Sequence, residues 1–128
     1  MNLLVDTVAL YRAATMPETL PEGVRRCLQD PANALHVSLV SAWELAIKAS
    51  IGKLVLPCAL EGFFVQSVRD LLATTLAIEL GAIARVTQLP PHHRDPFDRI
   101  IIAQALIGGL AVVTSDRRFE DYGVEVVW

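Results

Sequence analysis

The sequence predicts an α/β protein with a parallel sheet and helices on both faces of that sheet. Two observations predict this class. Short apolar runs rich in β-branched residues recur along the chain, and stretches with the apolar spacing of amphipathic helices separate them. Strands that alternate with helices in this way favour a parallel sheet. The length of 128 residues is near the commonest domain size, so we expect one domain over residues 1–128.

The first half of the chain is expected to contain two strands and two helices. In order, these are a strand over 3–5, a helix over 21–29, a strand over 35–37 and a helix over 41–50. Ser41 is the expected N-cap of the second helix, and Gly52 is its expected C-cap. Glu44 stands three residues after Ser41, which fits a capping box, and four residues before Lys48, which fits an ion pair along the helix.

The second half is expected to continue the alternation. It should hold helices over 60–72 and 78–86, a loop over 88–94, a helix over 95–107, a strand over 110–114, a helical turn over 117–122 and a strand over 124–127. Asp95 and Pro96 form a strong helix start, with Asp at the N-cap and Pro at the first helical position. Gly108 and Gly109 should end the same helix.

Composition excludes several classes of protein. The net charge of −3 is not that of a protein held on nucleic acid by phosphate contacts alone, unless its acids hold divalent cations. No apolar run approaches the roughly 20 residues of a membrane span, and the N-terminus lacks the pattern of a signal peptide. Cys27 and Cys58 have no metal or redox spacing. We therefore expect a cytoplasmic protein without a membrane partner.

The chain has more apolar residues than a core of this size needs. Hydrophobic residues make up 53% of it, and the mean hydropathy is +0.44. Both values are high for a domain without a membrane segment. We therefore expect part of the apolar surface to form a self-interface or a groove for a partner.

Acidic residues stand where predicted strands end and where helices begin. Asp6 follows the first strand and Asp116 follows a later one, so parallel pairing would place both at one edge of the sheet. Glu44, Asp95 and Asp98 lie near the starts of helices that should begin at that edge. Carboxylates this close repel one another unless cations intervene, and all-oxygen sites suit Mg²⁺ or Mn²⁺. Such ions, with their bound water, make a centre that cleaves phosphodiesters.

Each acid taken alone also has an ordinary structural explanation. Asp6 could end its strand in a turn, and Asp116 could cap the helical turn that follows. Asp95 fits an N-cap, and Asp98 in the first turn fits the helix dipole. The metal hypothesis therefore depends on the common position of these acids at one edge rather than on any single residue.

Polar and basic residues flank the acids. Thr7 and Ser115 each adjoin a key acid and are candidates for substrate contact, for orienting water or a carboxylate, or for capping turns. Arg99 is a candidate for binding a substrate phosphate. The other basic side chains of these segments, expected mostly at solvated surface positions, are His92, His93, Arg94, Arg117 and Arg118. The two histidines lack the spacing of a zinc site.

Several short motifs occur together along the whole chain. In order, they are Leu3-Leu4-Val5-Asp6-Thr7, Ser41-Ala42-Trp43-Glu44-Leu45-Ala46-Ile47-Lys48, Gly52-Lys53-Leu54, Leu89-Pro90, His93-Arg94-Asp95-Pro96-Phe97-Asp98-Arg99, Ile101-Ile102-Ala103-Gln104-Ala105, Thr114-Ser115-Asp116 and Tyr122-Gly123-Val124. Their order and spacing resemble those of the PIN-domain nucleases and, among these, the VapC-type toxins with an Asp-Pro-Phe-Asp-Arg motif. One departure is visible: Val8, Tyr11 and Arg12 follow the first Asp-Thr, where that subgroup often has His and Trp.

The resemblance implies a three-layer α/β/α fold with a four- or five-stranded parallel sheet. It implies an endoribonuclease that uses metal-activated water, is silenced by a cognate antitoxin and often forms a homodimer, which would account for the apolar excess. The metal site and catalytic centre it implies, on Mg²⁺ or Mn²⁺, consist of Asp6, Glu44, Asp98 and Asp116. Asp95 is an additional acid of the subgroup and a further candidate ligand.

Two other classes of protein share parts of this pattern. A receiver-type signalling module has a similar length, sheet and acidic pocket, but it needs paired acids after the first strand and a late lysine. Here Asp6 stands alone and no lysine follows Lys53, so this class is excluded. A catalytically inactive PIN fold that binds RNA or protein is the alternative to a nuclease, and the intact acids favour the nuclease.

Overall fold

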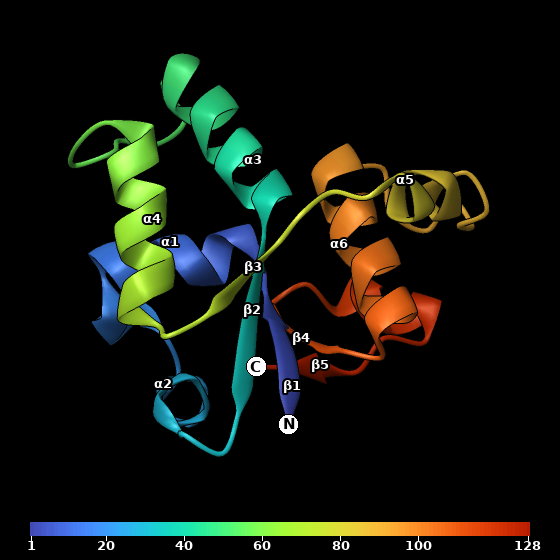
Figure 1. Cartoon of the computed structure of the whole chain (residues 1–128), viewed down its shortest axis with the longest axis horizontal. Helices are drawn as coiled ribbons and strands as arrows, with labels where there is room; N and C mark the ends of the chain where they lie inside the picture. The colour runs from blue at the N-terminus through green and yellow to red at the C-terminus, as the bar shows by residue number, and fades with distance from the viewer.

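Five parallel strands form the central sheet of the computed structural model, which describes residues 1–128. The strands are β1 (Asn2–Val5), β2 (Ala34–Ser38), β3 (Thr74–Leu76), β4 (Ala111–Val113) and β5 (Val126–Val127). Their order is β3-β2-β1-β4-β5, so the chain builds one side of the sheet first and then crosses to the other (Figure 1). Every neighbouring pair is parallel, which confirms the predicted fold class.

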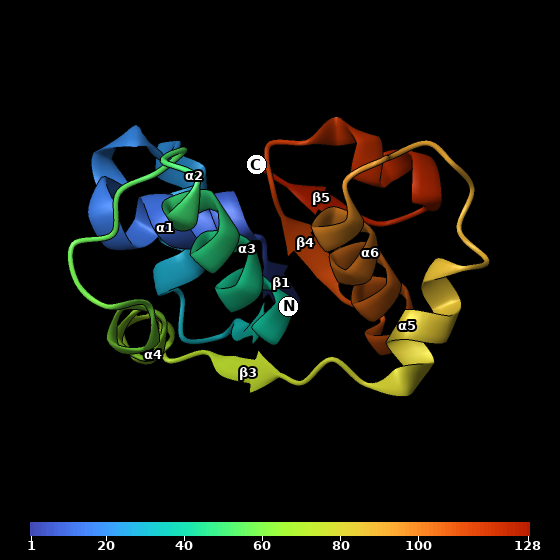
Figure 2. The same ribbon diagram turned by 90° about the horizontal axis from the view of Figure 1, so that it is seen from above.

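Helices cover both faces of this sheet, which gives the molecule three layers (Figure 2). They are α1 (Thr7–Thr15), α2 (Glu22–Gln29), α3 (Leu39–Ser50), α4 (Leu60–Asp70), α5 (Leu80–Val86) and α6 (Pro96–Gly108), with the 3-10 helices η1 (Pro17–Thr19) and η2 (Arg117–Tyr122). The core on one face lies under α1, α2 and α4, and the core on the other lies under α5, α6 and η2. α3 contacts α1, α4 and α6, so it stands where the two helical layers meet.

The strand residues alternate between the two cores. In β1, Leu3 and Val5 are buried under α1, α2 and α4, whereas Leu4 is buried on the α5 and α6 side. β4 alternates in the same way, with Val113 on the first side and Val112 on the second. Because helices cover both faces, every buried position in these two strands is apolar. Full burial of one such side chain stabilises the fold by roughly 1.5–3 kcal/mol.

The sequence analysis did not predict three elements, namely α1, β3 and the short 3-10 helix η1. α1 begins directly after β1, with Asp6 as its N-cap and with Ala9 and Leu10 buried. β3 is three residues long and lies at the edge of the sheet, where Thr74 and Thr75 are exposed. A short edge strand with exposed threonines contains no apolar run, so the search for such runs missed it.

The predicted start of the helix over 41–50 is wrong. The N-cap of α3 is Ser38, whose Oγ accepts a hydrogen bond of 3.1 Å from the backbone N–H two residues later. β2 therefore passes into the helix without a loop. Ser41 lies inside the helix, is buried, and accepts a hydrogen bond of 2.9 Å from the Thr7 hydroxyl. The predicted capping box with Glu44 is excluded for the same reason.

Glycines in the left-handed conformation follow α3, α6 and the 3-10 helix η2. Gly109, with φ of 62°, is the C-cap of α6, as the Gly pair predicted. The prediction that Gly52 caps α3 is wrong by one residue, because the C-cap is Ile51 and Gly52, with φ of 76°, follows it. None of the helices has the length and apolar character that a bilayer crossing requires.

Candidate metal centre

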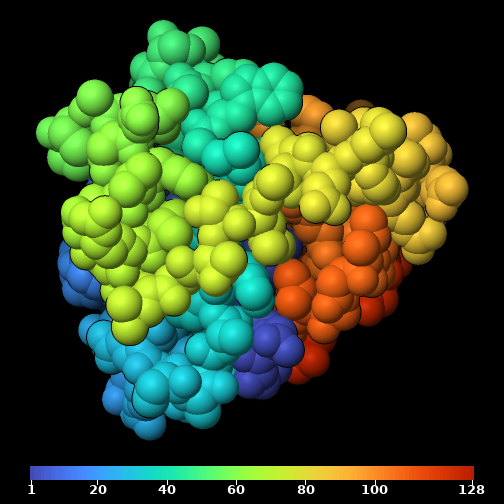
Figure 3. All heavy atoms as spheres, viewed as in Figure 1, coloured from blue at the N-terminus to red at the C-terminus, as the bar shows by residue number.

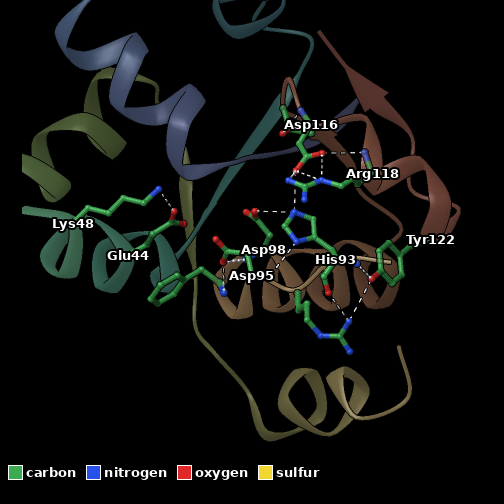
Figure 4. A network of polar contacts seen from close by, with 11 residues as sticks. Glu44, Lys48, His93, Asp95, Asp98, Asp116, Arg118 and Tyr122 are labelled. Carbon is green, nitrogen blue, oxygen red and sulfur yellow. Dashed lines mark hydrogen bonds and ion pairs between the residues drawn. The ribbon is translucent and has the colours of Figure 1, made fainter. Parts of the chain in front are cut away.

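Acidic side chains from four segments meet at the carboxyl edge of the sheet. β1 and β4 are neighbours, so the residues that follow them lie at the same edge. Figure 4 shows Asp98, from the first turn of α6, between Glu44 of α3 and Asp116 beyond β4. The acids whose charges act on Asp98 are Asp95, Glu44, Asp6 and Asp116. The structure thus brings together all five acids that the sequence placed at one edge.

Burial and mutual repulsion raise the pKa of two of these carboxyl groups. Burial is the largest cause for both, raising the pKa of Asp6 to about 6 and that of Asp98 to about 8. The negative charges of Asp95 and Glu44 add to the shift of the Asp98 pKa. Carboxyl groups that resist ionisation in this way are stabilised in their charged form by a nearby cation.

Three of the acids are also helix caps. Asp6 Oδ1 accepts a backbone hydrogen bond of 2.7 Å in the first turn of α1. Asp95 Oδ1 does the same for α6 at 2.8 Å, and Asp116 Oδ1 for η2 at 3.0 Å. The structural explanation and the metal hypothesis are therefore compatible, because each cap uses Oδ1 and leaves Oδ2 to other partners.

Glu44 is buried although it carries a charge, with only 3% of its surface exposed. Its Oε2 lies 2.6 Å from Lys48 Nζ, which confirms the predicted ion pair along the helix. Its Oε1 is buried and has no hydrogen-bond partner within the protein. A buried charged oxygen of this kind is costly unless a cation or donor satisfies it. Glu44 thus offers one oxygen to a metal.

His93 lies within the acidic cluster, whereas the sequence favoured a solvated loop position for it. It is 3% exposed, and its Nε2 is 2.8 Å from Asp116 Oδ2 and 3.1 Å from Asp98 Oδ2. Its Nδ1 accepts a hydrogen bond from the backbone N–H of Asp95, so the neutral ring carries its proton on Nε2. His93 therefore donates a hydrogen bond to Asp116, lies close to Asp98 and offers no lone pair to a metal.

Packing holds the His93 ring in this position. The ring meets Phe119 edge to face, with centroids 6.0 Å apart, and Phe119 is fully buried. The backbone N–H of His93 donates to the Tyr122 hydroxyl at 2.7 Å. These contacts join η2 to the loop before α6, and no sequence pattern predicted them.

Asp116 pairs with Arg118 on the solvent side. The Arg118 guanidinium donates to both oxygens of the carboxylate, with Nε to Oδ1 at 2.9 Å and Nη2 to Oδ2 at 2.7 Å. These hydrogen bonds are the main reason that the pKa of Asp116 is lowered to about 2. His92, Arg94, Arg117 and Arg118 are exposed, as predicted.

The three residues suggested for substrate contact lie in different surroundings. Thr7 is buried, and its hydroxyl bonds to Ser41 of α3, so it links the start of α1 to the helix that carries Glu44. Ser115 is exposed beside Asp116. The Arg99 terminal nitrogens donate to the carbonyl of Val86 at the end of α5 and to three carbonyls of the loop before α6, at 3.0–3.1 Å. Arg99 thus supports the loop that positions His93, which differs from the expected phosphate contact.

Replacing Arg99 by lysine should lower the free energy of unfolding by about 2 kcal/mol, because an ammonium group cannot reach the carbonyls that the planar guanidinium joins. Denaturant unfolding measures the loss. The matched control is Arg94→Lys, at an exposed position of the same loop, which should change stability by less than about 0.5 kcal/mol. Equal stability of the two variants would mean that Arg99 does not hold the loop.

The donor set fits Mg²⁺ or Mn²⁺ better than a softer metal. All the free ligand atoms are carboxylate oxygens, and Glu44 Oε1 has no other partner within the protein. Residues His93, Asp98 and Asp116 place ligand-type atoms within 4.8 Å of one another. Because the His93 ring is a donor here, the two carboxylates are the groups that could hold an ion.

The sequence matches the family model described as PIN domain over residues 3–125, and the chain belongs to that family. Its fold is similar to that of a DNA-bound VapBC structure from Salmonella typhimurium, with 20% identity and a TM-score of 0.70 over 99% of this chain and 97% of the other. VapBC2 from Rickettsia felis, bound to a promoter DNA fragment, gives 13% identity and a TM-score of 0.69 over 99% and 98%. FitAcB from Neisseria gonorrhoeae gives 18% identity and a TM-score of 0.62, over 98% of this chain and 96% of the other. No curated protein matches the chain.

Proposed function

We propose that this chain is a Mg²⁺- or Mn²⁺-dependent endoribonuclease that serves as the toxin of a toxin–antitoxin pair. The observation that carries the proposal is the convergence of carboxylates at one sheet edge, two of them with raised pKa values. Such a cluster attracts divalent cations and by itself repels a phosphodiester. Membership of the PIN-domain family, and the likeness in fold to VapBC and FitAB structures, support a nuclease rather than another metal enzyme.

In the proposed reaction the protein supplies ligands and their positions. We assign Asp6, Glu44 and Asp98 as ligands, and Glu44 presents a buried oxygen that has no hydrogen-bond partner. Asp116 completes the set, held in place by the proton on His93 Nε2. Asp95 is a weaker candidate, because its Oδ1 is committed to capping α6. A bound divalent cation supplies a Lewis acid for the phosphodiester and lowers the pKa of a bound water.

Exposed apolar side chains on α3 support a protein partner. Leu39, Trp43, Ile47 and Ile51 recur every four residues along this helix and are 44%, 58%, 36% and 59% exposed. α3 projects from one end of the molecule (Figure 3). We propose that the chain contacts proteins as well as RNA, namely a cognate antitoxin and a second copy of itself.

The test of the proposed function is metal-dependent RNA cleavage. Purified protein with Mn²⁺ should cut a single-stranded RNA at internal positions, a chelator should stop the reaction, and added Mn²⁺ should restore it. Asp121→Asn is the matched control, because Asp121 is an exposed acid of η2 outside the cluster, and this variant should cut at the wild-type rate. A folded protein that binds RNA with Mn²⁺ but never cuts it would instead be an inactive PIN-fold adaptor.

A further inference from the structure

Both oxygens of the Asp116 carboxylate are already occupied by donors from the protein. Oδ1 accepts from the Arg118 backbone N–H and from Arg118 Nε, and Oδ2 accepts from Arg118 Nη2 and His93 Nε2. Figure 4 shows the Arg118 guanidinium laid against the Asp116 carboxylate. A metal ion can take an oxygen of Asp116 only if one of these donors leaves.

Arg118 is the donor that is free to leave. The His93 side chain is 2% exposed, and its other nitrogen is tied to the Asp95 backbone. The Arg118 side chain is 58% exposed and ends a long, flexible stem, so solvent can accept its guanidinium with little rearrangement. Lys48 is the other cation that pairs with an acid of the cluster. Its side chain is only 32% exposed, and its partner Glu44 is buried.

We propose that Arg118 is an exchangeable counter-ion of the metal centre, which pairs with Asp116 when the metal is absent and contacts a phosphate of the RNA when a divalent cation holds that carboxylate. The proposal rests on the proposed function, because it takes RNA as the substrate. The same planar fork of N–H groups fits a carboxylate or a phosphate. Arg118 thus competes with the metal for Asp116 in the metal-free protein and assists RNA binding in the metal-bound protein.

These two roles predict changes of opposite sign when Arg118 is replaced by alanine. Mn²⁺ affinity without RNA, measured by titration calorimetry, should increase about fivefold, because the competitor is lost. RNA affinity in the presence of Ca²⁺, measured by fluorescence anisotropy on a short single-stranded RNA, should decrease about fivefold. The slope of log affinity against log salt should fall by about one. A residue that only stabilised η2 would weaken both affinities together.

Arg117→Ala is the matched control. Arg117 is the neighbouring exposed arginine and pairs with Glu120 rather than with the cluster, so its loss removes the same charge and should change the Mn²⁺ affinity less than twofold. Arg118→Lys should bind RNA better than Arg118→Ala, because it keeps a charge without the fork.

The outcomes separate this proposal from the proposed function. Unchanged or weaker Mn²⁺ binding by Arg118→Ala overturns the exchange, as does unchanged RNA binding by a variant whose wild-type parent binds RNA. A wild-type protein that binds no RNA under any of these conditions overturns the proposed function, and the role of Arg118 in RNA binding with it. Neither measurement requires cleavage.

Discussion

Asp98→Asn should lower metal-dependent RNA cleavage by at least about 100-fold while leaving the protein folded. Asparagine has nearly the same shape and can stay close to His93 Nε2, but it removes one negative charge from the centre of the cluster. Initial rates at saturating Mn²⁺ measure the loss. Asp6→Asn should have a similar effect, and Asp121→Asn should not. Residual activity above a tenth of the wild-type rate would remove Asp98 from the centre.

The same variant should be more stable than the wild type without metal at alkaline pH. The Asp98 pKa is raised from 3.8 to about 8 in the folded protein, so the unfolded chain loses this proton first as the pH rises. Wild-type stability should therefore decline between about pH 4 and pH 8 and stay reduced above that range. Asp98→Asn lacks this decline and should gain on the order of 2 kcal/mol at pH 8 in chelator. Thermal unfolding at pH 5 and pH 8 tests this, and a lower stability of the variant at pH 8 would contradict the repulsive cluster.

Phe119→Ala should cause the largest loss of stability, about 4 kcal/mol. The ring is fully buried in the core under α5 and α6, and it also packs against the edge of His93. The cavity therefore opens directly beside the ring that holds Asp98 and Asp116. Thermal unfolding should show a Tm lower by about 15 °C, and Mn²⁺ affinity at a temperature where the variant is folded should also fall.

Phe119→Leu is the control for that substitution. Leucine refills part of the volume, so its cost should stay near 1.5 kcal/mol, with a smaller change in metal affinity. A Phe119→Ala variant less than about 1 kcal/mol below the wild type would mean that η2 is only loosely attached. Unchanged metal affinity in the folded variant would mean that the position of His93 does not depend on this contact.

The strands and acids that follow a regular pattern could be predicted from the sequence. Apolar runs such as 3–5 and 110–114 mark buried parallel strands, because helices cover both of their faces. Once β1 and β4 are parallel neighbours, Asp6 and Asp116 must lie at one edge. The common position of the acids therefore depends on topology alone, and not on side-chain detail.

The contacts that complete the site could not be predicted, because they join residues with no regular spacing. His93 lies in a loop between Pro91 and Asp95, and only the folded chain brings it to Asp116. Arg99 follows Asp98 in sequence, yet its side chain turns back to the loop carbonyls instead of facing the acids. Sequence places a residue near an acid, but the helix phase and the loop path decide what its side chain contacts.

The caps formed by Asp6, Asp95 and Asp116 determine how the acids can be dissected by mutation. Alanine at any of these positions would remove a charge and also leave the first turn of a helix without its acceptor, at a cost of about 1 kcal/mol. An alanine scan would thus confuse a frayed helix with a missing ligand. Asparagine keeps the cap and deletes only the charge. Glu44 and Asp98 do not cap a helix, so this problem does not arise for them. A comparison of Asn and Ala at each of the three capping positions would separate the effect of losing the helix cap from the effect of losing the charged ligand.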